Sequence, residues 1–222
     1  MKDTASLVAT AYTAIYRKIV GLEYQPGQRL SEKLLITDLD IGRTPIREAL
    51  RSLESDMLVE SQPKKGVVVR PITLQNTKAV FTALTILETG VAELAVLGDH
   101  LLEIEAMNEA NHRLAKAVDA LDVFTLVDSN NDFHAAFSRC SANIYIIEAL
   151  RKTRCEANRL AYLSFANEIG PEQPLRNHYN QVIEQHQAMI DCIKKRDGTA
   201  LKEITLAHIA VFKQRIVNYL AS

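Results

Sequence analysis

Residues 42–54 read GRTPIREALRSLE, and this segment gives the strongest indication of how the first part of the chain folds. We expect a helix that starts at Thr44, because threonine is a good N-cap and Pro45 then takes the first helical position, where its missing N–H costs nothing. One face of this helix is apolar, and arginines four residues apart share another face. The apolar positions are Ile46, Ala49, Leu50, Leu53 and Met57, and the arginines are Arg43, Arg47 and Arg51.

Two helices precede this segment and a hairpin follows it. Residues 6–22 repeat apolar side chains at helical spacing, and Ser31 is a suitable N-cap for a short second helix. Residues 58–61 and 67–70 are β-prone runs joined by the basic turn QPKKG, in which Gly66 suits a positive φ. The order helix, helix, tight turn, helix, basic hairpin predicts a winged helix-turn-helix domain over residues 1–73.

Residues 74–222 show six successive helical patterns and no strand pattern. Because the breaks between these patterns are short, we expect a six-helix antiparallel bundle, and the fold class of the chain is mainly α. The predicted helices cover residues 76–98, 100–118, 121–140, 143–167, 174–196 and 198–220.

Composition argues against several classes of protein. The 222 residues contain no apolar run close to the ~18 residues of a transmembrane helix, so we expect no membrane contact and no secretory signal. The three cysteines are widely spaced and form no zinc pattern, which suits a reducing cytoplasm. The net charge is −1, but residues 1–70 carry +2 and the remainder −3. This asymmetry has the sign expected for an N-terminal DNA-binding domain.

The third helix is suited to the major groove of double-stranded DNA, where the N-terminal residues of such a helix reach base edges. Arginine can make paired hydrogen bonds to guanine, and a helix N-terminus can hold a phosphate. An arginine row also fits a solvated face, so the prediction depends on the capped helix, the arginines and the basic hairpin together. The residues predicted to face DNA are Arg29, Arg43, Thr44, Arg47, Arg51, Lys65 and Gly66, with Lys64 beside them.

Three histidines are predicted to meet inside the bundle. Asn130 and His134 project together from one helix, and His186 and His208 each lie eleven residues from Asp197. If the last two helices form a hairpin that turns at Asp197, both imidazoles lie ~16 Å from the turn. A third imidazole from a neighbouring helix would complete a metal site of a kind common in bundle cores. The same histidines also fit core or surface positions without a ligand.

The N-terminal part resembles the GntR family of bacterial regulators over nearly all of residues 10–72. The marks are PGQRLSE at 26–32, GRTPIREALRSLE at 42–54, LV at 58–59 and KGVVV at 65–69. The resemblance implies that the residues contacting operator DNA are those matching Arg29, Arg43, Thr44, Arg47 and Gly66.

Three positions depart from the GntR pattern. Gly42 stands where the family usually has serine, and Asp40 stands in place of the usual turn glycine. Aspartate tolerates the left-handed conformation, so we expect the turn to survive. Asp56-Met57 replaces the usual acidic residue and glycine before the hairpin. None of these departures removes a principal DNA contact.

Residues from about 76 to 220 resemble, more loosely, the ligand-sensing FCD domain of the FadR subfamily, in its shorter VanR-like branch. The marks are FH at 133–134, SAN at 141–143, EQH at 184–186, DG at 197–198 and AH at 207–208. Many members bind a divalent metal ion, often zinc or nickel, through one aspartate and three histidines. The histidines match His134, His186 and His208, and the aspartate position is Asn130, which offers a neutral carbonyl oxygen.

The resemblance also implies a small organic acid as effector, held by the metal ion or by arginine. Leu84 stands where many relatives carry an arginine, four residues before Glu88. Arg154 and Arg159 are the candidate effector ligands, although we expect a solvated face for at least two of Arg151, Arg154 and Arg159.

Together these features predict a cytoplasmic, homodimeric transcriptional regulator that binds a pseudo-palindromic operator. We expect it to act as a repressor and to respond to the organic acid. Two alternatives stay open. One is a metalloenzyme that uses the three histidines, although Glu184 points away from His186 and gives no convincing general base. The other is a metal-free regulator whose histidines hydrogen-bond the effector directly.

Overall fold

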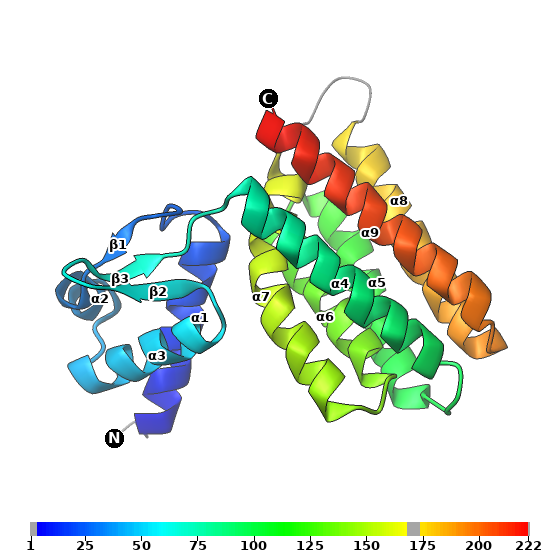
Figure 1. Ribbon diagram of the computed structural model, residues 1–222, viewed down its shortest axis with the longest axis horizontal. Helices are drawn as coiled ribbons and strands as arrows, with labels where there is room; N and C mark the ends of the chain where they lie inside the picture. The colour runs from blue at the N-terminus through cyan, green and yellow to red at the C-terminus, as the bar shows by residue number, and fades with distance from the viewer. Residues whose placement is uncertain (1–3, 168–173, 222) are drawn as a thin grey trace. The chain divides into compact units, whose positions relative to one another are not determined.

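The computed structural model of the chain describes residues 4–167 and 174–221. The chain divides into two compact units, Met1–Thr73 and Leu74–Ser222 (Figure 1). The elements of the first unit are α1 (Thr4–Val20), β1 (Arg29–Leu30), α2 (Glu32–Leu39), α3 (Arg43–Ser55), β2 (Val59–Gln62) and β3 (Gly66–Val69).

The first unit is the predicted winged helix-turn-helix. Helix α1 packs on α3, and the three strands form an antiparallel sheet in the order β1-β3-β2. Val59 pairs with Val69 and Gln62 with Gly66, which fixes the register of the hairpin. Strand β1 was not predicted, because a strand of two residues is too short to show an alternating pattern. The core contains the predicted apolar faces of α1 and α3, among them Ala11, Ile15, Ile19, Ile46, Ala49, Leu50 and Leu53.

The start of α3 differs from the prediction. The helix begins at Arg43 with Gly42 as its N-cap, so the expectation that Thr44 caps the helix is wrong. Pro45 is therefore the third helical residue, where the N–H of any residue would still lack an intrahelical partner, and the proline costs no hydrogen bond. Glycine is an acceptable N-cap, which explains why the helix starts two residues earlier than expected.

Positive φ angles mark the ends of the elements in this unit. Asp40 has φ 51° at the turn between α2 and α3, and Gly66 has φ 78° at the hairpin, so both predicted turn conformations are confirmed. Met57 has φ 63° and is 50% exposed. The expectation that Met57 extends the apolar face of α3 is wrong, because the helix ends at Ser55 and the chain reverses at this left-handed residue.

The second unit consists, over its described residues, of six helices close to the predicted ranges. Helix α4 packs against α7 and α9, helix α5 against α6 and α8, and α8 against α9. The helices are α4 (Leu74–Leu94), α5 (Leu101–Ala120), α6 (Val123–Arg139), α7 (Ile144–Ala166), α8 (Leu175–Lys195) and α9 (Gly198–Ala221). The tight connection between α8 and α9 is the predicted turn at Asp197, and it returns α9 alongside α8 (Figure 1).

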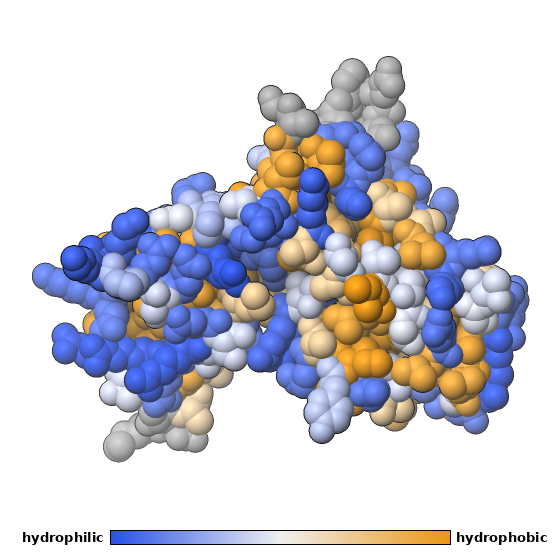
Figure 2. All heavy atoms as spheres, viewed as in Figure 1, coloured by the Kyte–Doolittle hydropathy of each residue, from blue (hydrophilic) through white to orange (hydrophobic). Residues whose placement is uncertain are grey.

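The two units differ in the apolar side chains that they expose. Figure 2 shows apolar patches between polar side chains on the viewed face of the helical unit. The large exposed apolar residues of the first unit are Leu34 and Met57, whereas those of the second are Leu74, Ile86, Leu97, Leu101, Leu102, Leu121, Ile144, Tyr145, Leu206 and Leu220. None of the described helices is long and apolar enough to span a bilayer.

Candidate functional site

The exposed face of α3 carries the predicted arginine row. Arg43, Thr44, Arg47 and Arg51 are all exposed, whereas the opposite face of the helix is buried in the core. Arg43 lies in the first turn, where the free N–H groups and the helix dipole favour a phosphate or another anion. The arrangement therefore presents three guanidinium groups along one accessible side of a helix whose other side is fixed by packing.

Arg47 is held by a carboxylate that the sequence analysis did not identify. Its Nε lies 3.0 Å from Glu32 Oε1 and 2.9 Å from Oε2, so both carboxylate oxygens accept from one N–H. The Arg47 side chain remains 54% exposed, and the hydrogen bonds to Glu32 involve Nε. A surface groove of about 300 Å³ adjoins this pair and is lined from α3 and the hairpin by Leu50, Arg51, Glu54, Ser61 and Val67.

The hairpin brings a second group of predicted residues together. Gly66 and Lys65 are exposed at its tip, and Arg29 on β1 lies beside the glycine. A Cβ atom on Gly66 would lie 3.9 Å from Arg29 Nε, and its φ of 78° disfavours any other residue. Arg29 and the hairpin tip thus form one basic edge of the first unit.

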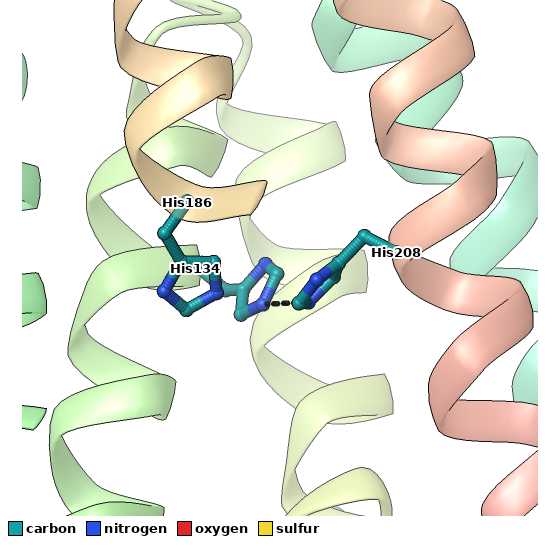
Figure 3. A group of neighbouring side chains, drawn as sticks. All are labelled: His134, His186 and His208. Carbon is teal, nitrogen blue, oxygen red and sulfur yellow. Dashed lines mark hydrogen bonds between the residues drawn. The ribbon is translucent and has the colours of Figure 1, made fainter. Parts of the chain in front are cut away.

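Three histidines meet in the helical unit, as predicted. His134 from α6, His186 from α8 and His208 from α9 are buried, and each offers one ring nitrogen within 4.8 Å of the other two (Figure 3). The Nε2 atoms of His134 and His208 are 3.2 Å apart. The ring centroid of His186 lies 5.2 Å from that of His134 and 4.9 Å from that of His208.

The outer nitrogens of these rings face oxygen atoms. His208 Nδ1 lies 2.9 Å from Gln185 Oε1, and His186 Nδ1 lies 3.2 Å from Asn111 Oδ1. His134 Nδ1 lies 3.5 Å from Glu88 Oε1. Within the described part of the chain, His186 Nε2 and His134 Nδ1 are both buried without a hydrogen-bond partner, so the contact of His134 with Glu88 is not a hydrogen bond. The cluster therefore contains two buried nitrogens whose hydrogen bonds are not supplied by the described residues.

Burial keeps the three imidazoles neutral. It lowers the pKa of His134 and His186 well below the ordinary histidine value and that of His208 to about 3. The positive charge of Arg154 lowers all three pKa values further. A neutral imidazole is the form that ligates a metal ion, so the protonation state of the cluster suits a metal site.

A small cavity adjoins the cluster. It holds about 20 Å³, room for roughly one water molecule. Its polar lining comes from Asn130, Arg154, His178 and His208, and Leu84 is among the apolar side chains around it. Asn130 is 6% exposed and lines this cavity together with His208.

The arginines of α7 have different surroundings. Arg154 is buried and pairs with Glu88, and Arg159 is fully buried and donates to Glu156 Oε2 over 2.8 Å. Arg151 is exposed beside Glu148. The expectation of a solvated face for at least two of these arginines is therefore wrong, because α7 is buried on most sides in the bundle. Arg154 lines the cavity, whereas Arg159 is not among its lining residues.

Sequence reasoning missed two buried polar residues near the cluster. His178 on α8 lines the same cavity and contacts Ser164 Oγ over 3.1 Å, and burial lowers its pKa to about 3. Asn111 on α5 reaches His186 across 75 positions in the sequence. Neither belongs to a local motif, and only the packing of the helices brings them to the site.

Two family models match the chain. The model for bacterial regulatory proteins of the gntR family matches residues 7–69, and that for the FCD domain matches residues 79–211. The HTH-type transcriptional repressor RspR of Escherichia coli (strain K12) is 25% identical over 208 residues, which is 92% of this chain and 86% of that protein.

Solved structures show the same fold. E. coli McbR/YncC matches with a TM-score of 0.79 at 19% identity and covers 100% of this chain and 99% of its own. A putative transcriptional regulator GntR from Rhodococcus sp. RHA1 matches with a TM-score of 0.76 at 20% identity. The match covers 96% of this chain and 98% of that one. The matched family and the relatives are transcriptional regulators, so the metalloenzyme alternative is not retained. The chain belongs to the gntR family of bacterial regulatory proteins and carries an FCD domain.

Proposed function

We propose that this DNA-binding regulator is a homodimeric repressor whose helical unit binds a divalent metal ion, zinc or nickel, together with a small organic acid. Binding of the acid lowers the affinity of the first unit for its operator. Because the target is DNA, we place the protein in the cytoplasm. The repressor form is supported by the name of the relative RspR, a transcriptional repressor.

The DNA contacts follow from exposure and charge. Arg43 and Arg47 lie in the first two turns of α3, where side chains reach base edges in the major groove. Arg51, Lys65 and Thr44 are suited to phosphate oxygens, which set register without reading sequence. Arg29 and Gly66 at the hairpin edge fit a neighbouring groove, since the glycine lets the backbone approach closely.

The observation that carries the metal proposal is the buried, unpartnered Nε2 atom of His186, whose ring lies beside two other imidazoles. The 3.2 Å between His134 Nε2 and His208 Nε2 is close to the separation of about 3.3 Å between two nitrogens bound to one tetrahedral zinc ion. Asn130 would supply an oxygen ligand from the same region. When bound, the ion would act as a Lewis acid that attracts a carboxylate.

The cavity supports an anionic effector. Three imidazoles and Asn130 bring no negative charge to a divalent ion, and the positive charge of Arg154 in the lining is paired with Glu88. The bound ion would therefore supply the net positive charge that attracts a carboxylate. Since the cavity has room for about one water molecule, an organic acid binds only if the surrounding helices move apart. A ligand that binds the opened form better shifts the population toward it, which is how the signal would leave the helical unit.

The apolar side chains exposed on the helical unit support the homodimer. Of the twelve large apolar residues exposed in the described parts of the chain, ten belong to this unit, and exposed apolar surface that gathers into patches marks interaction sites. Two copies related by a twofold axis would place two α3 helices on a pseudo-palindromic operator, with half-sites about one helical turn or a multiple of it apart.

The test begins with genomic DNA fragments recovered on the purified protein and sequenced. We expect a pseudo-palindromic site that the zinc-loaded protein binds and that a panel of small organic acids releases. His186→Ala should still bind the site but lose release, because it removes a ligand and leaves α3 intact. His112→Ala changes an exposed histidine of α5 and should behave as wild type.

Release by the same acid after removal of metal with a chelator, and in the His186→Ala variant, would overturn the metal part of the proposal and favour direct hydrogen bonding by the histidines. Failure of every organic acid in the panel to change DNA binding of the zinc-loaded protein would overturn the effector part.

A further inference from the structure

We propose that Asn111 is a positioning residue of the histidine cluster: it holds the His186 imidazole as the tautomer with its proton on Nδ1 and leaves Nε2 free to bind a divalent cation. The role in metal binding rests on the proposed function. The position of the proton is a property of the chain itself, and it can be measured without metal.

The orientation of the Asn111 amide is fixed by a second contact. Asn111 lies on α5, is 6% exposed, and its Nδ2 donates to the backbone oxygen of Ile183 on α8 over 3.2 Å. A carbonyl oxygen can only accept, so the NH₂ group must face Ile183. The amide oxygen Oδ1 is consequently the atom that faces His186.

This orientation determines the tautomer. Oδ1 has no proton to give, so His186 Nδ1, at 3.2 Å, must be the donor. A fully buried imidazole without a carboxylate partner is neutral and has one ring proton. That proton is on Nδ1, and Nε2 therefore carries a lone pair in the ring plane that is free to accept. Nε2 is the same atom that finds no hydrogen-bond partner among the described residues.

Phe133 fixes the ring plane while Asn111 fixes the rotation within it. The Phe133 and His186 rings are stacked, with centroids 3.6 Å apart and an interplanar angle of 5°. Stacking alone would allow the imidazole to turn over and present either nitrogen. The hydrogen bond to Asn111 selects one of these orientations, so the two contacts together preorganise the ring.

The other two rings have acceptors in corresponding places. Gln185 Oε1 lies 2.9 Å from His208 Nδ1, and the Glu88 carboxylate lies 3.5 Å from His134 Nδ1. Three helices thus place an oxygen near the Nδ1 atom of each imidazole. The Nε2 atoms of His134 and His208 form a hydrogen bond with each other (Figure 3), so in the metal-free protein one of these two atoms carries a proton, and we assign the Nδ1–H tautomer to His186 alone. Asn111 is the acceptor whose orientation a second hydrogen bond establishes, and it is the one we test.

The first measurement is the ¹⁵N spectrum of the imidazoles in metal-free protein, with His186 assigned from a His186→Gln variant. We expect wild-type His186 as the Nδ1–H tautomer. In Asn111→Leu, which removes the acceptor at similar volume, the ring should shift toward Nε2–H. In Asn111→Asp, which keeps an oxygen acceptor, it should remain Nδ1–H. A wild-type ring protonated at Nε2 would overturn the proposal.

The second measurement is zinc affinity by competition with a chromogenic chelator. Loss of an outer hydrogen-bond partner typically weakens metal binding ~10–100-fold, and we expect this for Asn111→Leu but not for Asn111→Asp. The matched control is Asn108→Leu, because Asn108 lies on the same helix and its side chain donates within that helix, to Ile104 O. Equal zinc affinity in Asn111→Leu and wild type would overturn the positioning role.

The two measurements separate this proposal from the proposed function. If the wild-type protein binds no zinc but shows the expected tautomers, the metal proposal fails while the assignment of the proton by Asn111 stands. If zinc binds and His186 is protonated at Nε2 in the metal-free protein, the metal proposal stands and the role of Asn111 fails. A folding defect in Asn111→Leu would show in its thermal midpoint, and the wild-type and Asn111→Asp spectra would still decide the question.

Discussion

The two units of this regulator place functional charge in opposite environments. In the first unit the predicted DNA ligands are exposed, and Arg47 retains 54% exposure even when paired with Glu32. In the helical unit the corresponding residues are buried, and Arg154 is 7% exposed beside Glu88. A large polyanion is bound at a surface by groups that reach outward, whereas a small ligand is bound by groups already removed from water.

Because of this difference, substitutions in the two units should affect DNA affinity and the free energy of unfolding to different extents. An exposed ion pair contributes little to the free energy of unfolding, because solvent screens it. A buried pair carries a desolvation cost, and removing one partner leaves the other charge buried without compensation. Substitutions in the first unit should therefore change DNA affinity with little effect on folding, whereas substitutions around the histidines should change both.

The largest expected effect is on folding. Arg154→Leu should lower the free energy of unfolding by about 3–5 kcal/mol, because it leaves the Glu88 carboxylate buried and unpaired. Urea denaturation measures this change. Arg151→Leu removes an exposed arginine one turn earlier and should stay within about 0.5 kcal/mol of wild type. The double variant Glu88→Leu, Arg154→Leu should recover most of the loss. Equal effects of the Arg154 and Arg151 changes would contradict the comparison.

The next effect is on DNA. Arg47→Ala and Arg43→Ala should each weaken binding to the recovered operator by about 1–3 kcal/mol, roughly 5- to 150-fold, and relax sequence preference, with an unchanged thermal midpoint. Fluorescence anisotropy measures the affinity. Arg17→Ala, an exposed arginine of α1, is the control and should have a much smaller effect. If both α3 variants bound the operator with wild-type affinity, α3 would not be the helix that contacts DNA.

Lys65→Ala should have a smaller and sequence-independent effect. As a phosphate contact at the hairpin tip, it should weaken binding to specific and random DNA alike and reduce the slope of log affinity against log salt by about 0.9. Affinities at several salt concentrations give this slope. An unchanged slope would mean that Lys65 does not contact the backbone of DNA.

The smallest effect concerns a turn outside both sites. Met57 adopts φ 63°, which is strained for a residue with a Cβ, and its side chain is half exposed. Met57→Gly should raise the free energy of unfolding by about 0.5–1 kcal/mol without changing DNA affinity. Asp40→Gly is the matched comparison and should gain less, since aspartate tolerates this conformation. A loss of stability in Met57→Gly would show that its remaining packing outweighs the strain.

The fold of the first unit was predictable because its signals are local. The apolar face of α3, the N-cap at Ser31 and the turn at Gly66 each depend on a few neighbouring residues, and all three are found in the structure. The errors are local as well. Gly42 rather than Thr44 caps α3, because an earlier start was compatible with Pro45. The pairing of Arg47 with Glu32 joins two helices, and neither helix shows a local sequence pattern that predicts it.

In the helical unit, periodicity predicted the helices and the turn at Asp197, and equal distances from that turn brought His186 and His208 together. The outer partners of the histidines could not be predicted in this way. Asn111 and Glu88 come from helices whose rotation about their own axes is set by the whole core. The expectation that at least two of Arg151, Arg154 and Arg159 are solvated failed for a similar reason. The sequence of α7 does not show how many neighbouring helices cover it, and both Arg154 and Arg159 are buried.

The central claim is that three buried histidines of the helical unit form one metal site, and a zinc titration of metal-free protein in competition with a chromogenic chelator tests it most directly. We predict one tightly bound zinc ion per chain in wild type and in His112→Ala, and loss of that binding in His186→Ala. Absence of tight binding in wild type, or equal binding in wild type and His186→Ala, would contradict the claim.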